Sequence, residues 1–223
     1  MTPRPSRRER PAKPALTRDG IIATAVGVLR AEGLDKVTMR RLAAELDTGP
    51  ASLYVYVRNT GELHAAVLDT LLGEVDRPAA TGPWLDRLTG LLSSYTRVLF
   101  AHPGLARSAL VSRPHGPNYV ALVDAVLGLL HEGGVPVDRA AWALDVLLQL
   151  ATATAAEHSE PGADDAEQWA ALSEVVRTAD PTTHPHIARA GDHLLSGTGP
   201  DRLTWAFAAL VAGAAHTPRE STP

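Results

Sequence analysis

The amino-acid sequence has no cysteine, few aromatic residues and no long apolar run among its 223 residues. The absence of cysteine excludes a disulfide framework and thiolate metal sites. The longest apolar run, residues 205–215, is shorter than the ~20 residues that cross a bilayer. Residues 1–20 contain no apolar stretch typical of a secretory signal, so we expect a soluble cytoplasmic protein. The hydrophobic fraction of 45% is nevertheless sufficient for a packed core.

Charge is distributed unevenly along the chain. Residues 1–60 hold eleven basic and six acidic residues, a net charge of +5, whereas the remainder carries −9 and brings the total to −4. A basic segment favours a polyanionic partner, of which nucleic acid is the commonest. On charge alone, the alternative is a basic tail that only improves solubility.

The N-terminal quarter contains a basic arm followed by helical patterns. Residues 1–15 combine four proline and five basic residues with almost no apolar content, which is typical of a disordered segment. Apolar periodicity and capping residues then predict helices over 17–33, 38–46 and 50–57. Asn59 and Glu62 have the spacing of a capping box, which predicts a fourth helix that runs to about Arg77.

Proline and glycine recur beyond residue 78 and separate further helix-length segments. Apolar residues follow one face of segments 84–100 and 117–131. Segments 137–157 and 200–216 are apolar around most of their circumference, so each should be buried on more than one side. The alternation typical of strands is not evident between the breakers. The pattern predicts an all-α protein of roughly nine or ten helices.

The segments 38–46 and 50–57, separated by a three-residue turn, have the spacing of a DNA-binding helix-turn-helix. The internal contacts between the two helices are assigned to Leu42, Ala43, Leu46, Leu53 and Val57. This assignment leaves Ser52, Tyr54, Val55 and Tyr56 facing outward, where a DNA major groove would cover their apolar area. Alternatively, Tyr54 packs against the first helix as part of the core, and the two roles are compatible.

The motif Val37-Thr38-Met39-Arg40-Arg41-Leu42-Ala43-Ala44-Glu45-Leu46, followed by Ser52-Leu53-Tyr54-Val55-Tyr56-Val57 and Glu62-Leu63, resembles the DNA-binding domain of TetR-type transcriptional repressors. The resemblance covers about residues 17–75. His102-Pro103, residues 116–118 and the long helix after Gly133-Gly134 resemble the ligand-binding, dimerising domain of the tetracycline-repressor branch. The implied organisation is a disordered basic arm over 1–15, a helix-turn-helix DNA-binding domain over 16–60 and a ligand-binding and dimerisation domain over 61–223.

The resemblance implies roles for individual residues. Thr38 would cap the second helix and touch a phosphate, and Tyr56 stands where relatives often have histidine. The sequence departs from the family at Asp47, where glycine is common, and at Thr60, where relatives commonly have a lysine for a phosphate contact. The predicted DNA-contacting residues are Arg4, Arg7, Arg8, Arg10, Thr38, Arg40, Pro50, Ser52, Tyr54, Tyr56 and Thr60. The four arginines of the arm would follow the adjacent minor groove, or else form an untethered tail of non-specific affinity.

A protein that reads a palindrome with two such domains must be a dimer. We assign the dimer interface to segments 137–157 and 200–216, which are apolar around most of their circumference. The alternative is that both segments form the core of one subunit. The predicted interface residues are Trp142, Val146, Leu150, Thr154, Trp205, Ala208, Ala209, Ala212 and Gly213.

The remaining helices would surround a cavity for a drug-sized organic molecule, because apolar walls with a few polar groups suit such a ligand. Each wall residue could instead be ordinary core. The candidate wall residues are Trp84, Leu88, Tyr95, Leu99, Phe100, His102, Arg107, Tyr119, Trp142, Gln149 and Trp169.

Catalysis and metal binding find little support in the sequence. It contains neither a G-x-S-x-G nucleophile motif nor a phosphate-binding loop, and His184 and His186 are poorly spaced for one metal site. The absence of such motifs favours a non-enzymatic, cofactor-free protein, and the resemblance implies a homodimeric repressor that binds a palindromic operator and is released by a small organic effector. The alternatives are a DNA-binding regulator without a small-molecule ligand, and an α-helical enzyme or carrier whose helix-turn-helix is accidental.

Overall fold

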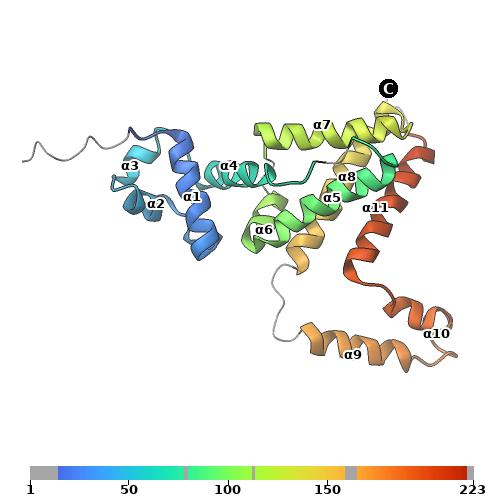
Figure 1. Cartoon of the computed structure of the whole chain (residues 1–223). Coiled ribbons are helices and arrows are strands. Elements are labelled where there is room, and N and C mark those ends of the chain that lie inside the picture. Colours follow the sequence, from blue (N-terminus) through green and yellow to red (C-terminus); the bar gives the residue numbers. More distant parts are fainter. Residues whose placement is uncertain (1–14, 78–79, 112–113, 159–164, 220–223) are drawn as a thin grey trace, which may run out of the picture. The chain divides into compact units, whose positions relative to one another are not determined.

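The structure is a computed structural model that describes residues 15–77, 80–111, 114–158 and 165–219. All regular secondary structure within these ranges is helical, with eleven α-helices and two short 3-10 helices (Figure 1). This confirms the predicted all-α class, with slightly more helices than expected because short elements follow Pro181. The chain divides into two compact units between Leu63 and His64.

The first unit contains α1 (Arg18–Glu32), η1 (Leu34–Lys36), α2 (Met39–Glu45), α3 (Pro50–Leu53) and the first four residues of α4 (Thr60–Leu72). Thr17 caps α1, since its Oγ1 accepts a hydrogen bond of 3.1 Å from the N–H of Gly20. Gly33 ends this helix at a positive φ of 88°. The side chains that fill the core of this unit are Ile21, Ala25, Leu42, Leu53, Val57 and Leu63, all fully buried.

Local chemistry explains the turn between α2 and α3. Thr38 caps α2, because its Oγ1 accepts from the N–H of Arg41 at 3.2 Å. Asp47 adopts a φ of 47°, a left-handed conformation that aspartate tolerates better than most residues. Pro50 occupies the first turn of α3, where its missing N–H has no helical partner to lose.

Two predicted helices are shorter than expected. The segment 50–57 is α-helical only to Leu53, and residues 54–56 form a turn in which the N–H groups of Tyr56 and Val57 both donate to the Leu53 carbonyl. Successive aromatic and β-branched residues have weak helix propensity, which accounts for the early end. The helix predicted to reach Arg77 ends at Leu72, where tighter i→i+3 hydrogen bonds begin at Gly73.

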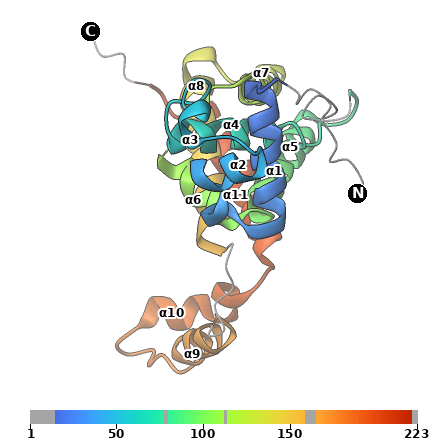
Figure 2. The same cartoon turned by 90° about the vertical axis from the view of Figure 1, so that its left-hand side faces the viewer.

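The second unit is built around α8 (Val137–His158), which packs against α5 (Trp84–Phe100), α6 (Pro103–Val111), α7 (Pro117–Glu132) and α11 (Gly199–His216). Its core is formed by buried side chains from these helices, which include Leu88, Leu92, Leu99, Leu147 and Phe207. The remaining elements, α9 (Asp165–Arg177), α10 (Pro185–Ala190) and η2 (Gly191–Leu195), pack on one another, and α9 and α10 lie side by side in both views (Figure 1 and Figure 2). Within the described residues, none of the helices combines the length and apolar character that crossing a membrane requires.

Candidate nucleic-acid interface and effector cavity

An exposed aromatic surface follows α3. Tyr54, Val55 and Tyr56 are 51%, 80% and 36% exposed, whereas Leu53 and Val57 on either side are fully buried. The buried pair anchors the turn, so the three side chains between them point away from the core. Because Tyr54 is half-exposed, packing in the core does not account for its whole side chain. Ser52 and Pro50 are exposed on the same short segment.

Two adjacent arginines at the start of α2 differ in their surroundings. Arg41 lies 2.7 Å from Glu32 and 2.7 Å from Glu45, and hydrogen bonds to both carboxylates raise its pKa above the ordinary value. This side chain joins α1 to α2 within the unit. Its neighbour Arg40 is exposed and is the one predicted to contact DNA.

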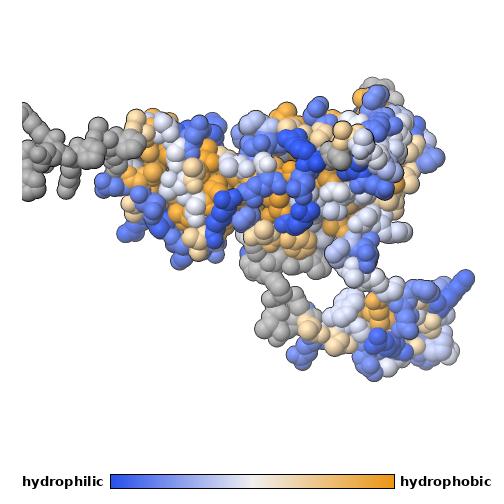
Figure 3. Space-filling view, in the orientation of Figure 1, coloured by the Kyte–Doolittle hydropathy of each residue, from blue (hydrophilic) through white to orange (hydrophobic). Residues whose placement is uncertain are grey.

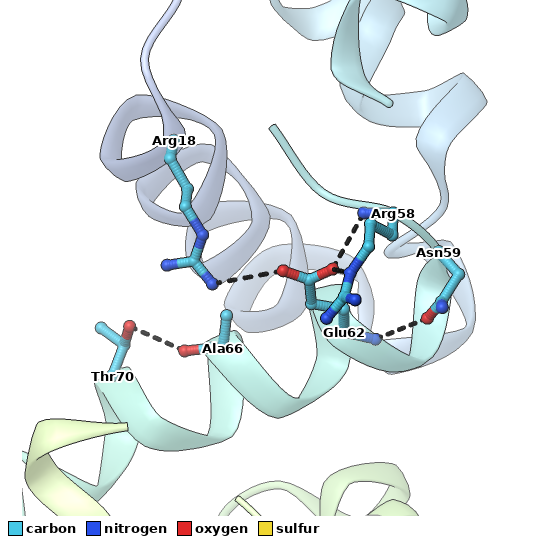
Figure 4. Close-up of polar contacts among 6 residues, drawn as sticks. All are labelled: Arg18, Arg58, Asn59, Glu62, Ala66 and Thr70. Carbon is cyan, nitrogen blue, oxygen red and sulfur yellow. Dashed lines mark hydrogen bonds and ion pairs between the residues drawn. The ribbon is translucent and has the colours of Figure 1, made fainter. Parts of the chain in front are cut away.

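A second group of charges surrounds Glu62 at the start of α4 (Figure 4). Its Oε2 accepts hydrogen bonds from the backbone N–H of Arg58 at 3.0 Å and from the Arg58 Nε at 3.1 Å, while Oε1 lies 3.8 Å from Arg18. These donors, the backbone N–H first, lower the pKa of the Glu62 carboxyl. Asn59 Oδ1 accepts from the Glu62 N–H at 2.8 Å, as the capping-box spacing predicts, but the carboxylate returns to Arg58 and not to Asn59.

Arg58 was not singled out from the sequence as a site residue. Its side chain is 85% exposed, and Glu62 contacts the guanidinium group through Nε, which orients the group. The signal in the sequence is the i,i+4 spacing of Arg58 and Glu62, together with a position two residues before Thr60, where a basic residue is expected by resemblance. Thr38 is committed to its cap, Thr60 is exposed at the start of α4, and the arm residues Arg4, Arg7, Arg8 and Arg10 lie outside the described residues.

A cavity of about 710 Å³ lies between α5, α8 and α11 of the second unit. Its walls are mostly apolar, with two arginines and three hydroxyl groups. The lining residues are Ser93, Thr96, Arg97, Phe100, Leu150, Thr154, Gly199, Pro200, Arg202, Leu203 and Ala206. Of the predicted wall residues, Phe100 lines this cavity.

The other predicted wall residues are dispersed. Leu88 and Leu99 are fully buried core. The hydroxyl of Tyr95 lies 2.7 Å from Thr152 Oγ1, and burial of this side chain raises the pKa of Tyr95 to about 12 although the hydrogen bond to Thr152 opposes the rise. Trp84, Tyr119 and His102 are half-buried, and Arg107 is exposed. Trp169 is half-exposed on α9, with the Arg202 guanidinium 5.9 Å from its ring centroid. Trp142 and Gln149 line grooves on α8.

The surface formed by α8 and α11 exposes large apolar side chains. Trp142, Val146 and Trp205 are 58%, 44% and 72% exposed, and two shallow grooves run between the helices. The small residues Ala209 and Gly213 line these grooves, while Leu150 and Thr154 also line the cavity. Ala208 is half-buried and Ala212 is exposed on the same helix. A further apolar patch lies on the group formed by α9 and α10 (Figure 3).

Acidic and histidine side chains are the candidate ligands for a metal ion. Within the part of the chain that the structure describes, three or more such residues do not come together in a group that could hold an ion. His184 Nδ1 instead lies 2.9 Å from the hydroxyl of Thr183.

A helix-turn-helix unit followed by a separate all-α unit defines the class of protein to which this chain belongs. Two family models match it: "Bacterial regulatory proteins, tetR family" over residues 21–67, and "Tetracyclin repressor-like, C-terminal domain" over residues 78–215. The chain belongs to the TetR family. This confirms the resemblance read from the two helix-turn-helix segments and from the later motifs.

Similar proteins cover the chain to different extents. The solved transcription regulator SCO7704 of Streptomyces coelicolor is 55% identical, with 95% of this chain and all of that chain covered at a TM-score of 0.77. ActR of the same organism, solved in complex with actinorhodin, is 35% identical over 90% of this chain and 96% of that chain, at a TM-score of 0.78. An HTH-type transcriptional regulator of Saccharopolyspora erythraea is 35% identical over 59% of this chain, and the match spans 56% of that relative's length. The chain thus spans about half the length of the curated relatives it matches first.

Proposed function

We propose that this protein is a homodimeric transcriptional repressor that binds a palindromic operator and is released by a small organic effector. The observation that carries the proposal is the exposed surface of Tyr54, Val55 and Tyr56 on a helix-turn-helix whose inner face is fully buried. An apolar and hydroxyl-bearing surface of this kind matches thymine methyl groups and phosphates in a major groove. Such a protein acts on DNA in the cytoplasm and has no catalytic step.

In this proposal, Tyr54 and Tyr56 approach the bases and sugar-phosphate edge, with Ser52 and Pro50 at the helix start. Arg40 reaches a base edge or a phosphate from α2, and Thr60 contributes only a hydroxyl at the start of α4. Arg58 supplies the cation that the family pattern places at Thr60, because it is exposed two residues earlier and is oriented by Glu62. Arg4, Arg7, Arg8 and Arg10 add electrostatic affinity from the arm.

Dimer formation would use the face of α8 and α11. Three large apolar side chains exposed on two adjacent helices are unfavourable in water unless a partner covers them. The small residues Ala209 and Gly213 allow a second backbone to approach closely, as in packed four-helix arrangements. Two subunits related by a two-fold axis would then present two reading surfaces to two half-sites about 34–36 Å apart.

The effector would occupy the cavity between α5, α8 and α11. Its volume of about 710 Å³ and its mostly apolar lining suit a drug-sized molecule. ActR, which is similar over most of this chain, has been solved with actinorhodin and with (S)-DNPA, and this supports a small organic ligand. The effector must bind one conformation more tightly than the other, and typical coupling changes DNA affinity by about 5–150-fold.

The test is selection of duplexes from a random-sequence library by the purified full-length protein. We expect an enriched palindrome, bound by the dimer, with affinity lost in the combined variant Tyr54→Ala/Arg40→Ala and kept in Arg189→Ala, an exposed arginine on α10. A protein that enriches no sequence over random duplex, or that remains a single subunit in solution, would refute the proposal. A screen in which compounds neither stabilise the protein thermally nor release it from the selected duplex would favour a regulator without a small-molecule ligand.

A further inference from the structure

The carboxylate of Asp69, on the second half of α4, is buried against the start of α7. Asp69 is 7% exposed, and its Oδ1 accepts a hydrogen bond of 2.8 Å from the backbone N–H of Tyr119. Its Oδ2 lies 3.5 Å from both the backbone nitrogen and the side-chain amide nitrogen of Asn118. The first-turn N–H groups of a helix lack helical partners and carry a partial positive charge, so a carboxylate there is stabilising. Asp69 therefore caps α7 from a different helix, 50 residues away in sequence.

Gly116 permits this approach. It occupies the N-cap position of α7 and provides no side-chain cap of its own. A Cβ at residue 116 would overlap the carboxyl group of Asp69. The backbone at Gly116 has a φ of −83°, which any residue can adopt, so the glycine is required by the close contact and not by the conformation. The hydrogen bonds and the space left by the missing Cβ are two separate observations of one close contact between the Asp69 carboxyl of α4 and the N-terminus of α7. We call this contact the joint.

The residues that follow α4 are tied to the same body. The guanidinium of Arg77 donates to the carbonyl of Ala121 on α7 at 3.3 Å. The N–H of Asp76 donates to Ser94 Oγ at 2.9 Å, and the Asp76 carboxylate lies 3.0 Å from Arg97 on α5. Arg97 also lines the 710 Å³ cavity. Asp76 and Arg77, which follow α4, thus have polar connections to α7 and to a wall of the cavity.

We propose that Asp69 is a positioning residue through which α7 sets the placement of α4, and that Asp69 and Gly116 together form the joint that passes a change in the helical body to the DNA-binding unit. The first four residues of α4 belong to the first unit and the others to the second, so a displacement of this one helix reaches both. The DNA part of this inference rests on the proposed function; the joint itself does not.

A double-mutant cycle in the full-length protein tests the joint. Gly116→Ala places a methyl group against the Asp69 carboxyl and should displace α7 from α4. In an Asp69→Ala background that obstacle is gone, so the same substitution should have no further effect. Gly128→Ala is the matched control, because Gly128 lies on the same helix and a Cβ there meets nothing within 4 Å. Asp69→Asn keeps an acceptor for the Tyr119 N–H and should give an intermediate result.

The first readout is hydrogen exchange of the α4 amides, measured by NMR without DNA. We expect Gly116→Ala to accelerate exchange in α4 by about tenfold, and Gly128→Ala to change it by less than twofold. An effect confined to α7, or an equal effect of Gly116→Ala in the Asp69→Ala background, overturns the joint. A melting-temperature scan of each variant accompanies the exchange data, because a variant that only lowers global stability accelerates exchange in every helix that exchanges through global unfolding, whereas a displaced joint accelerates exchange in α4 beyond the change in the other helices.

The second readout is affinity for the duplex enriched by the wild-type protein. Gly116→Ala should weaken binding at least about fivefold, the lower end of typical allosteric coupling, although the variant leaves the reading surface untouched. If the wild type binds and Gly116→Ala binds equally well, the proposed transmission is wrong. If the wild type enriches no duplex, the proposed function fails, and the exchange measurement still decides on the joint.

Discussion

Replacing Arg58 by alanine tests whether the Arg58 guanidinium contacts a DNA phosphate. Thr60, at the position where the family commonly has lysine, carries no positive charge for such a contact. The Arg58 side chain is 85% exposed, and Glu62 holds its Nε at 3.1 Å in the free protein. The substitution removes the exposed cation and leaves the buried neighbours Leu53 and Val57 in place. Any loss of DNA affinity therefore comes from charge and not from an altered core.

The magnitude follows from counterion release. Each phosphate contact contributes ~0.9 to the slope of log K against log[salt], so one Arg58 in each of two subunits should contribute about 1.8. When the salt concentration is raised from about 50 to 200 mM, that difference in slope lowers the ratio of the DNA-binding constants of wild type and variant about tenfold. The difference in DNA affinity between wild type and Arg58→Ala should thus be largest at low salt.

Fluorescence anisotropy of the labelled duplex across this salt range measures both slopes. Arg58→Lys retains the charge and should keep most of the slope, and Arg189→Ala on α10 serves as a charge-matched control with no expected change. A slope for Arg58→Ala equal to that of the wild type would show that Arg58 does not contact the backbone. The reasoning from its exposure and orientation would then be refuted.

Three further outcomes are expected. Tyr95→Phe should lower the free energy of unfolding by about 1–3 kcal/mol, because it leaves the buried Thr152 hydroxyl without its 2.7 Å partner, and Thr152→Val in addition should recover part of that loss in urea titrations. The pKa of Glu62 is lowered in the folded state, so the stability that its carboxylate contributes is present above the ordinary carboxyl pKa and is lost as the pH falls through the lowered value. Glu62→Gln should therefore flatten the acid side of a profile of unfolding free energy measured from about pH 3 to 7. An unchanged profile would contradict this. Trp142→Asp/Trp205→Asp should convert the dimer to single subunits in light scattering, since two exposed tryptophans would otherwise be covered at the interface, and an intact dimer would move the interface elsewhere.

The family and the local framework of the first unit could be predicted from sequence. The capping residues that predict helices over 17–33 and 38–46 are Thr17 and Thr38, and Asp47 adopts a left-handed conformation where glycine is common in the family. These features depend on interactions within a few residues, which a sequence displays directly. The prediction was wrong where propensity and periodicity competed, as at residues 54–56, where an apolar period continued but the helix did not.

The candidate cavity could not be predicted to the same degree. Leu99 and Phe100 are neighbours with similar apolar character, yet Leu99 is fully buried and Phe100 is 37% exposed at the cavity wall. Apolar periodicity shows that a side chain avoids water, but it does not show which helix covers it. Five of the eleven lining residues come from α11, far along the chain from α5, so only packing brings the walls together.

The sequence by itself determined that the chain is helical, that its N-terminal quarter is basic, and that a capped pair of short helices there leaves two tyrosines outside the core. Capping, charge and periodicity are local properties, and they are already complete in the order of the residues. Only the tertiary structure decided that Glu62 also lies 3.8 Å from Arg18 of α1 and that Asp69 caps a helix beginning at Pro117. The second contact joins residues 50 apart in sequence, and it needs a glycine whose purpose is visible only once the carboxylate lies beside it.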